Sequence, residues 1–330
     1  MSADRPGEFE TIAKLLRPLT GGDPAARNLA DDAAVLPVKP GHDLVLTKDV
    51  VVEGVHFLPE DPLDTVARKA LRVNLSDLAA KGAEPFAYLL AVSWRRGDGW
   101  SERELFARGL GEDNAHFGVR LLGGDTVLDD GPLVVSVTAL GWVAHGRSPA
   151  RDGARAGDVV VVSGAIGDGF LGLRAAKGVL RGLEEARVEA LLGRYRLPEP
   201  RLALARVVRD HAAASIDISD GLIADLGHVA LASGAQVELH LDRIPLSRAA
   251  RAWFEQRADP LVALADLASG GDDYEIACAV RPDHLDAFVR AAEKAGEPVT
   301  VVGRVLNGAG VRVLYEGGEV PVTHAGWAHD

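Results

Sequence analysis

Aspartates in this 330-residue chain recur beside glycine, serine or threonine, where strand-like or helix-like segments end. Magnesium takes hard oxygen ligands and keeps several waters, so one or two carboxylates and substrate phosphates usually hold it. Separated aspartates that meet at one cleft suit this ion, whereas a calcium EF-hand needs a contiguous loop, which the sequence lacks. We therefore expect such a site from six segments: Asp31-Asp32, Thr47 to Asp49, Asn74 to Asp77, Gly123 to Thr126, Ile216 to Gly221 and Ser269 to Glu275.

Several of these aspartates also have a purely structural interpretation. Asp31-Asp32 could form an ordinary turn, and Asp77 precedes Lys81 by four residues, the spacing of a surface ion pair on a helix. Asp220 could simply favour the positive end of a helix. Asp217 is harder to explain in this way. It is expected at the end of a strand, where its side chain would face the same way along the chain as that of Asp220. The conjunction of all the segments favours a functional site.

Glycine-rich turns raise the question of a nucleotide. Gly123 to Thr126 follows an apolar strand and suits close approach of the backbone to a ligand. No Walker A sequence occurs, which argues against a P-loop kinase. A Gly-x-Gly-x-x-Gly match exists at Gly167, Gly169 and Gly172, but the next strand is expected only near Ser215, too far for a βαβ unit of about 30 residues. A dehydrogenase remains the alternative.

Other chemistry-bearing residues are few. The single cysteine, Cys278, lies in an apolar strand-like run and is expected to be a buried thiol, and it excludes an internal disulfide framework. Histidine pairs with metal-ligand spacing do not occur. His56 could contact an anion or merely pack, and Trp327 could pack locally or stack on a flat ligand.

The segments between these motifs predict both helices and strands. Residues 43–52 and 158–163 have the pattern of strands, and residues 62–82 that of a helix with apolar residues on one face. Ser101 with Glu104 predicts the capping box of a second helix, and Ser219 predicts the cap of a third. Such mixing indicates an α+β (mixed α/β) protein.

Composition defines the class of protein and its division. The length favours two domains, and a polar stretch at 146–156 marks the boundary between domains 1–147 and 148–330. The formal net charge of −12 argues against a sequence-independent nucleic-acid partner. No apolar run approaches the roughly 18 residues of a membrane helix, and residues 1–6 lack signal-peptide character, so we expect no membrane partner and a cytoplasmic protein.

Taken together, the motifs resemble the thiamine-monophosphate kinase family, within the aminoimidazole ribonucleotide synthetase-like group. The similar stretches follow the family's order across nearly the whole chain: Gly7 to Phe9, Asp31 to Ala33, Thr47 to Phe57, Asn74 to Ala80, Gly123 to Thr126, Arg151 to Asp158, Ile216 to Leu222 and Gly270 to Glu275. The resemblance implies the two-domain fold of that group, with an N-terminal ATP- and magnesium-binding domain and a C-terminal α/β domain. It also implies a homodimer paired through the N-terminal sheets.

The resemblance further implies ATP-dependent phosphorylation of thiamine monophosphate to thiamine diphosphate. Asp125 and Asp217 would be catalytic. The ligands of Mg²⁺ would be Asp32, Thr47, Lys48, Asp49, Asp77, Asp125, Asp217 and Asp220. ATP would contact Gly124, Asp125, Arg151 and Ser219, and the thiamine phosphate would contact His56, Asp272 and Trp327. A phosphate monoester is mostly ionised at pH 7, so we expect direct in-line transfer with several Mg²⁺ ions and no general base.

Three residues depart from the family pattern. Lys48 stands in place of a hydroxyl residue and could bind a metal only through its carbonyl. Asp272 replaces a usual glutamate, and Phe117 replaces a common tyrosine that stacks on ATP.

Other members of the group remain alternatives. A selenophosphate synthetase would need a reactive N-terminal cysteine, and a hydrogenase-maturation dehydratase a C-terminal one; aminoimidazole ribonucleotide synthetase is possible on fold alone. A non-catalytic sensor of ATP and magnesium is the alternative outside enzymes.

Overall fold

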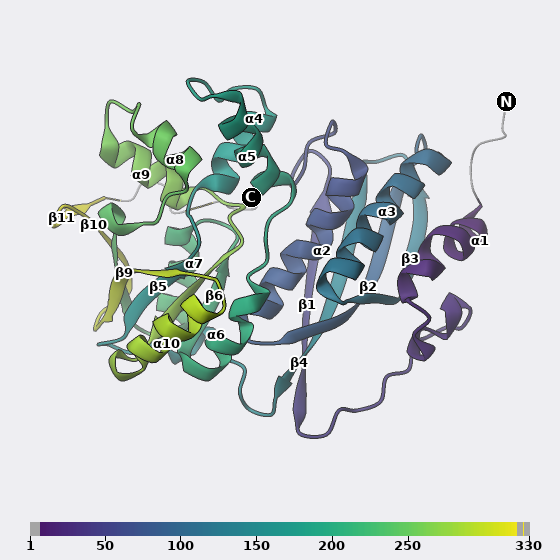
Figure 1. Ribbon diagram of the computed structural model, residues 1–330, viewed down its shortest axis with the longest axis horizontal. Helices are drawn as coiled ribbons and strands as arrows, with labels where there is room; N and C mark the ends of the chain where they lie inside the picture. Colours follow the sequence, from purple (N-terminus) through teal and green to yellow (C-terminus); the bar gives the residue numbers. More distant parts are fainter. Residues whose placement is uncertain (1–6, 322–325, 327–330) are drawn as a thin grey trace. The chain divides into compact units, whose positions relative to one another are not determined.

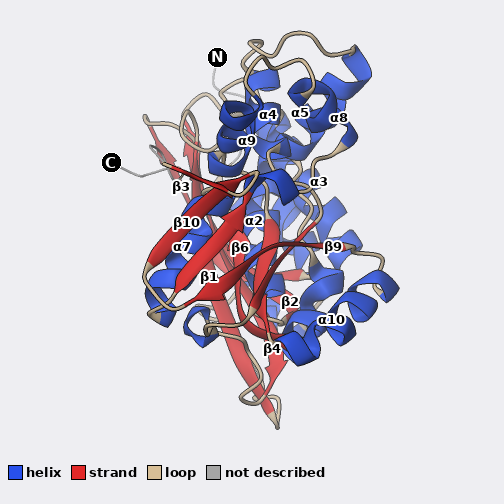
Figure 2. Cartoon of the chain, turned by 90° about the vertical axis from the view of Figure 1, so that its left-hand side faces the viewer, coloured by secondary structure: helices blue, strands red, loops and turns tan. Residues whose placement is uncertain are grey.

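The structure is a computed structural model that describes residues 7–321 and residue 326 (Figure 1). The chain divides into two compact units, and both contain helices and strands (Figure 2). The first unit comprises Met1–Leu78 and Glu84–Gly146, and the second comprises Ala79–Ala83 and Arg147–Asp330. The roles expected for domains 1–147 and 148–330 stay a prediction.

The first unit is built on a four-stranded sheet in the order β1-β4-β2-β3. β4 pairs antiparallel with β1 and β2, and β2 pairs parallel with β3. Helices α2 and α3 lie along one face of the sheet (Figure 1). The bounds are β1 His42–Val52, α2 Leu63–Ala80, β2 Glu84–Arg95, α3 Trp100–Phe117, β3 Arg120–Asp129 and β4 Val134–Ala144, after a short α1, Glu8–Thr11.

The two faces of this sheet differ in burial. Thr47 and Asp49 of β1 stand opposite Ala139 and Val137 of β4, which are fully buried under the helices. The alternate residues of β1 face the other side, where Leu46 is 60% exposed. Further apolar side chains on that open face are exposed as well: Leu44, Val50, Leu89 and Val127.

The second unit contains a seven-stranded sheet in the order β11-β10-β7-β9-β5-β8-β6. Only the β7–β10 pair is parallel among the described pairs. The strands are β5 Val159–Ser163, β6 Ala212–Ile218, β7 Gln236–His240, β8 Glu275–Val280, β9 Val299–Leu306, β10 Gly310–Tyr315 and β11 Gly318–Val320. The helices are α4 Asp168–Ala176, α5 Glu185–Arg196, α6 Ala205–His211, α7 Leu222–Ser233, α8 Arg248–Phe254, α9 Pro260–Ser269 and α10 Pro282–Lys294.

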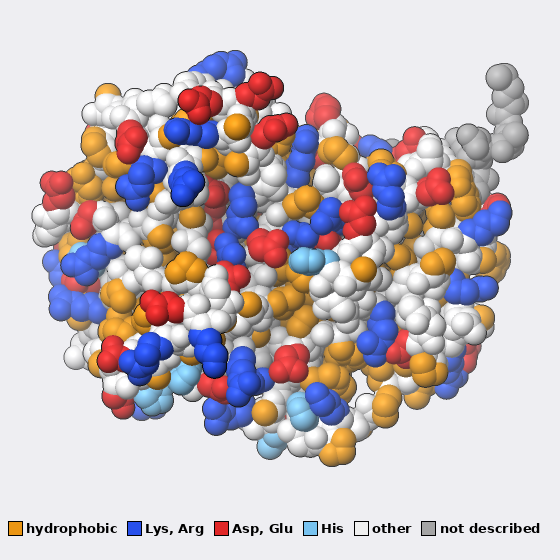
Figure 3. Space-filling model, viewed as in Figure 1, with side chains coloured by type: hydrophobic (Ala, Val, Ile, Leu, Met, Phe, Trp, Pro, Cys, Tyr) orange, Lys and Arg blue, Asp and Glu red, His pale blue; other side chains and the backbone are white. Residues whose placement is uncertain are grey.

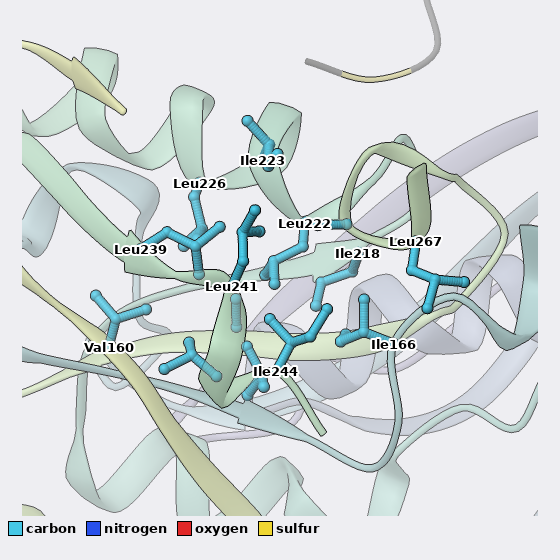
Figure 4. Close-up of a cluster of buried hydrophobic side chains, with 14 of the residues drawn as sticks. Val160, Ile166, Ile218, Leu222, Ile223, Leu226, Leu239, Leu241, Ile244 and Leu267 are labelled. Atoms are coloured by element: carbon cyan, nitrogen blue, oxygen red, sulfur yellow. The ribbon is translucent and has the colours of Figure 1, made fainter. Parts of the chain in front are cut away.

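Apolar side chains cover both faces of the second sheet. On one face Val160 packs in a large cluster with Leu222 and Leu226 of α7 (Figure 4). On the other face its neighbour Val161 packs with Phe288 of α10 and with Cys278. Cys278 is therefore buried, as expected, and burial raises the pKa of its thiol to about 12. Strands buried on both sides read as continuous apolar runs, as the sequence of β5 does.

Two of the predicted helix caps are wrong. α3 begins at Trp100, where the backbone N–H of Gly99 donates to Glu102 Oε2 at 3.0 Å, so Ser101 is not the capping residue. α7 begins at Leu222 after Gly221, so Ser219 lies in the preceding loop. In both cases a glycine precedes the first turn: Gly99 has an extended backbone, and Gly221 has a φ of 122°, which favours glycine.

Charged side chains of both signs are interspersed on the face shown in Figure 3. Within the described part of the chain, no helix combines the length and the apolar character needed to cross a membrane.

Candidate functional site

In the first unit, helix α2 brings two polar side chains against strand β1. Asn74 and Asp77 are three residues apart and so lie on one helix face. Asn74 Oδ1 accepts from the backbone N–H of Asp49 at 3.1 Å, and Thr47 Oγ1 donates to Asp77 Oδ2. The structure thus brings two predicted ligands, Thr47 and Asp77, into contact, and Asp49 faces the same side of β1 as Thr47.

Lys48 does not join this group with its side chain. It alternates with Thr47 and Asp49 along β1 and therefore faces the open side of the sheet. There its Nζ donates to Ser136 Oγ at 2.6 Å. This geometry leaves the Lys48 carbonyl as the group that could bind a metal.

Asp125 also lies on the open side of the sheet. Its neighbour Thr126 accepts a hydrogen bond at 2.7 Å from the indole N–H of buried Trp94, on the helix-covered side. Because successive side chains alternate, Asp125 points the other way. A Cβ on Gly124 would overlap the Leu90 carbonyl oxygen, so only glycine fits before Asp125. Gly123 to Thr126 thus lie within β3 and not in a turn after a strand, and the close approach of the backbone, which was expected toward a ligand, is to the neighbouring strand.

Asp125 and Asp32 line one cavity of about 470 Å³ in the first unit. The two adjacent aspartates at its rim are not equivalent. Asp31 pairs with Arg27, and this contact lowers the pKa of the Asp31 carboxyl. The Asp32 carboxylate makes no such contact with the described residues and is exposed. Among the other residues that line the cavity are Ile12, Leu16, Leu89, Gly123, Gly124 and Leu140.

His56 follows β1 in a turn. Its Nδ1 accepts from the backbone N–H of Val52 at 3.1 Å, so the proton of the neutral ring lies on Nε2. Lys69 Nζ donates to the carbonyl of His56 at 3.0 Å. The ring is therefore held with a donor nitrogen directed away from its own backbone, which is what contact with an anion requires.

In the second unit, Asp217 and Asp220 lie at the end of β6 and in the loop before α7. Asp217 is 6% exposed, whereas Asp220 is half-buried. Asp225 Oδ2 accepts from the backbone N–H groups of Ser219, Asp220 and Gly221, at 3.1, 3.1 and 3.2 Å. Burial raises the pKa of Asp225 to about 7, and the Asp220 charge adds to this effect. One carboxylate thus organises the whole turn.

Asp225 was missed in the sequence because it lies within a predicted helix. An acidic residue in the first turn was the available signal. Carboxylate oxygens of Asp220 and Asp225 and a ring nitrogen of exposed His228 lie within 4.8 Å of one another. A search for paired histidines does not find this mixed group.

The segment before β8 is hydrogen-bonded to the same turn. The N–H of Asp272 donates to the Ser219 carbonyl and that of Tyr274 to the Ile218 carbonyl, both at 2.8 Å. Asp272 therefore lies beside Asp217 to Asp220 in this unit. Arg151 has an exposed side chain, and its carbonyl accepts from Ser233 Oγ at 3.0 Å. Trp327 lies outside the described residues.

The Gly-x-Gly-x-x-Gly match binds an internal carboxylate. The N–H groups of Gly167 and Gly169 donate to Asp273 at 2.7 and 3.0 Å, at the N-terminus of α4. Burial raises the pKa of Asp273 well above its usual range, although both hydrogen bonds oppose the shift. Asp273 thus holds the place that the pyrophosphate of a dinucleotide would need. This geometry does not support the dehydrogenase alternative.

Known proteins share both the sequence and the fold of this chain. Residues 30–143 match the family model "AIR synthase related protein, N-terminal domain", and residues 155–316 match the corresponding C-terminal domain. The chain is 54% identical over 328 residues to the thiamine-monophosphate kinase of Caulobacter vibrioides, covering 99% of this chain and 92% of that protein. The chain belongs to the thiamine-monophosphate kinase family. It is therefore a phosphotransferase, as expected.

Solved structures of this kinase family confirm the predicted mixed helix-and-sheet fold with two domains. The crystal structure of the thiamine-monophosphate kinase from Stenotrophomonas maltophilia K279a has a TM-score of 0.79 at 38% identity, covering 88% of this chain and 90% of that one. The structure of AaThiL complexed with AMPPCP and TMP has a TM-score of 0.77 at 30% identity, covering 98% of this chain and 97% of that one.

Proposed function

We propose that this chain transfers the γ-phosphoryl group of ATP to thiamine monophosphate and so forms thiamine diphosphate. The observation that carries the proposal is the near-complete match to the kinase of Caulobacter vibrioides, at 54% identity. The relative complexed with AMPPCP, an ATP analogue, and with TMP supports the same pair of substrates.

The donor atoms of the proposed ligands suit Mg²⁺. Carboxylates and a hydroxyl are the hard oxygen ligands this ion prefers, and several are half-buried or exposed and so accessible. Bound Mg²⁺ would neutralise phosphate charge and help to align the two substrates. The residues proposed to hold the ions are Asp32, Thr47, Asp49, Asp77, Asp125, Asp217 and Asp220, with the carbonyl of Lys48.

Other residues are proposed to bind and orient the substrates. The exposed guanidinium of Arg151 offers several donors to the phosphates of ATP, and Ser219 adds a hydroxyl. The Arg72 guanidinium lies over one face of the Phe117 ring, 5.1 Å from the ring centre. The other face of the ring is therefore the one proposed to stack on ATP. Gly124 is proposed to contact ATP through its backbone.

The thiamine phosphate would be held at its two ends. His56 would donate from Nε2 to the phosphate, and the carboxylate of Asp272 would contact the cationic or amino groups of thiamine. Trp327 is proposed as a third contact. The acceptor oxygen is already ionised at pH 7, so the chain need not supply a base. We therefore propose direct in-line transfer; labelled protein after incubation with γ-labelled ATP alone would contradict it.

ADP release with and without thiamine monophosphate tests the proposed function. ADP that appears only with thiamine monophosphate and Mg²⁺ supports the kinase. No release under saturating ATP and Mg²⁺ would contradict it and would favour a nucleotide sensor. Asp125→Asn and Asp217→Asn should each lower kcat by about a hundredfold or more, because charge stabilisation is the main catalytic term.

Asp129→Asn is the matched control for Asp125→Asn. Asp129 is exposed on β3 and, four residues on, faces the same side of the sheet. Its variant should keep kcat within about twofold of wild type. Near-normal kcat for Asp125→Asn in saturating Mg²⁺ would show that its assigned role is wrong.

We also propose that the enzyme is a cytoplasmic homodimer. The open face of the first sheet exposes Leu44, Leu46, Val50, Leu89 and Val127, and a second copy of this face would cover them. The proposed location rests on the intracellular supply of ATP.

A further inference from the structure

The segment between α9 and β8 has an unusual backbone. Asp272 and Tyr274 have φ angles of 70° and 51° and lie in the left-handed region, which non-glycine residues rarely adopt. Aspartate visits this region more readily than most residues, but the bulky Tyr274 does so rarely. Such conformations persist only where the surrounding structure imposes them, and they often mark binding sites. Both residues flank Asp273.

Asp273 supplies the contact that fixes this segment. Its side chain is 1% exposed, and its two oxygens accept separately from Gly167 and Gly169 at the N-terminus of α4. A Cβ on Gly169 would overlap the Asp272 carbonyl oxygen, so helix and segment are in direct contact. The carboxylate therefore ties the segment to a helix end whose amides favour a negative group.

The flanking residues are tied on the opposite side. Asp272 and Tyr274 donate their N–H groups to the carbonyls of Ser219 and Ile218. The segment is thus held between α4 and the turn after β6, with Asp273 directed one way and its two neighbours the other.

The side chain of Asp272 is placed by this arrangement. Tyr274 Oη donates to Asp272 Oδ1 at 3.2 Å. Aspartate has few rotatable bonds, so the position of its carboxylate follows the position of its backbone. A glutamate could adapt its reach through one more rotatable bond, which this chain lacks.

We infer that Asp273 is a positioning residue for substrate binding, because it fixes the strained backbone that presents the Asp272 carboxylate to thiamine monophosphate. The inference rests on the proposed function. The inference is that the Asp273 carboxylate affects the binding of thiamine monophosphate selectively, in addition to stabilising the fold.

The test compares Asp273→Asn with wild type in the full chain. Asparagine keeps one acceptor oxygen but turns an amide N–H₂ toward a backbone N–H, so one of the two hydrogen bonds is lost. Amide hydrogen exchange in peptides covering 164–175 and 269–276 should accelerate at least about tenfold. KM for thiamine monophosphate should rise about tenfold, while KM for ATP and kcat stay within about twofold.

Asp168→Asn is the matched control. Asp168 is also buried at the start of α4, but its carboxylate accepts from Ser247 Oγ at 2.6 Å and not from the strained segment. This variant removes a buried charge at the same helix end and should leave KM for thiamine monophosphate within about twofold. An equal rise in both variants would reduce Asp273 to a structural role and overturn the inference.

A second variant covers the case in which Asp273→Asn does not fold. Tyr274→Phe removes only the hydroxyl that contacts Asp272 and should raise KM for thiamine monophosphate about threefold, with KM for ATP unchanged. If KM for thiamine monophosphate is unchanged in every folded variant, the inference about Asp273 is overturned but the proposed function is not. If wild type releases no ADP with thiamine monophosphate, the proposed function is overturned. The hydrogen-exchange measurement does not depend on activity and can still be interpreted.

Discussion

Asp225 accepts a hydrogen bond from the backbone N–H of Asp220 on the same oxygen that binds the N–H groups on either side. The carboxylate is 2% exposed and lies inside the turn that carries the proposed ligands. It orders three residues of this turn without occupying the outer surface, where a metal or phosphate would bind.

Asp225→Asn should therefore loosen the turn and weaken binding of ATP with Mg²⁺. The amide oxygen of asparagine can take the place of Oδ2, but it carries no charge and is a weaker acceptor, so the three hydrogen bonds should weaken at a cost of about 1 kcal/mol of unfolding free energy. We expect KM for ATP to rise about tenfold and the requirement for Mg²⁺ to increase. Steady-state kinetics over a range of Mg²⁺ concentrations, with thermal unfolding in parallel, provide the measurement.

Asp283→Asn is the control for this prediction. Asp283 also lies in the first turn of a helix, α10, but it is exposed and caps no neighbouring turn. Its variant should keep the wild-type dependence on Mg²⁺. The same loss in both variants would mean that any first-turn carboxylate has this effect.

Asp31 and Asp32 should differ sharply despite their adjacency. Asp31 is engaged by Arg27, whereas the Asp32 carboxylate is exposed at the cavity that also contains Asp125. Asp32→Asn should lower kcat at least about tenfold, and Asp31→Asn should keep it within about twofold, because only Asp32 is available to a cation. Initial rates at saturating substrates decide this. Equal losses would indicate an effect of charge on the whole loop.

The open face of the first sheet should be a subunit interface. Leu46 is 60% exposed on this face, and a buried glutamate without a partner strongly disfavours association. Leu46→Glu should convert the proposed dimer into a species of 34.8 kDa, measured by light scattering after size-exclusion chromatography.

Leu231→Glu is the matched control for the interface. Leu231 is 81% exposed on α7, in the other unit of the chain. It should leave the oligomeric state unchanged. A wild type that is already monomeric at micromolar concentration would contradict the prediction.

Local patterns in the sequence were sufficient for the main elements. The apolar repeat of residues 62–82 predicts α2, and the continuous apolar run of β5 matches burial on both faces. Thr47 and Asp77 come into contact, and Asn74 reaches the backbone of Asp49, because helix and strand periodicities fit each other.

Features that depend on distant contacts could not be predicted. Ser219 reads as a helix cap, yet the amides before α7 bind Asp225 instead. Gly167 and Gly169 read as a nucleotide site, yet the anion they bind is Asp273, more than 100 residues further along the chain. A local motif shows that a helix end can bind an anion, but the fold determines which anion it is.

Cys278 should be inert in the folded protein. The residue is 3% exposed, and burial raises the pKa of its thiol to about 12, from an ordinary value of 9.0. At pH 8 the fraction of thiolate would be about a thousandfold lower than for an unshifted cysteine. The reaction should slow accordingly, because only the thiolate attacks. Reaction with an aromatic disulfide at pH 8 should therefore be slow in buffer, and one thiol per chain should react rapidly in denaturant.

The same shift predicts how stability depends on pH. The folded pKa lies above the unfolded one, so the contribution of Cys278 is fully present below pH 9 and is lost as pH rises toward about 12. Urea unfolding at pH 8 and pH 10 measures this loss of unfolding free energy. Cys278→Ala should remove the part that Cys278 contributes and leave the part due to other groups that titrate in this range. Rapid modification of the native thiol at pH 8 would contradict both its burial and the direction of the pKa shift.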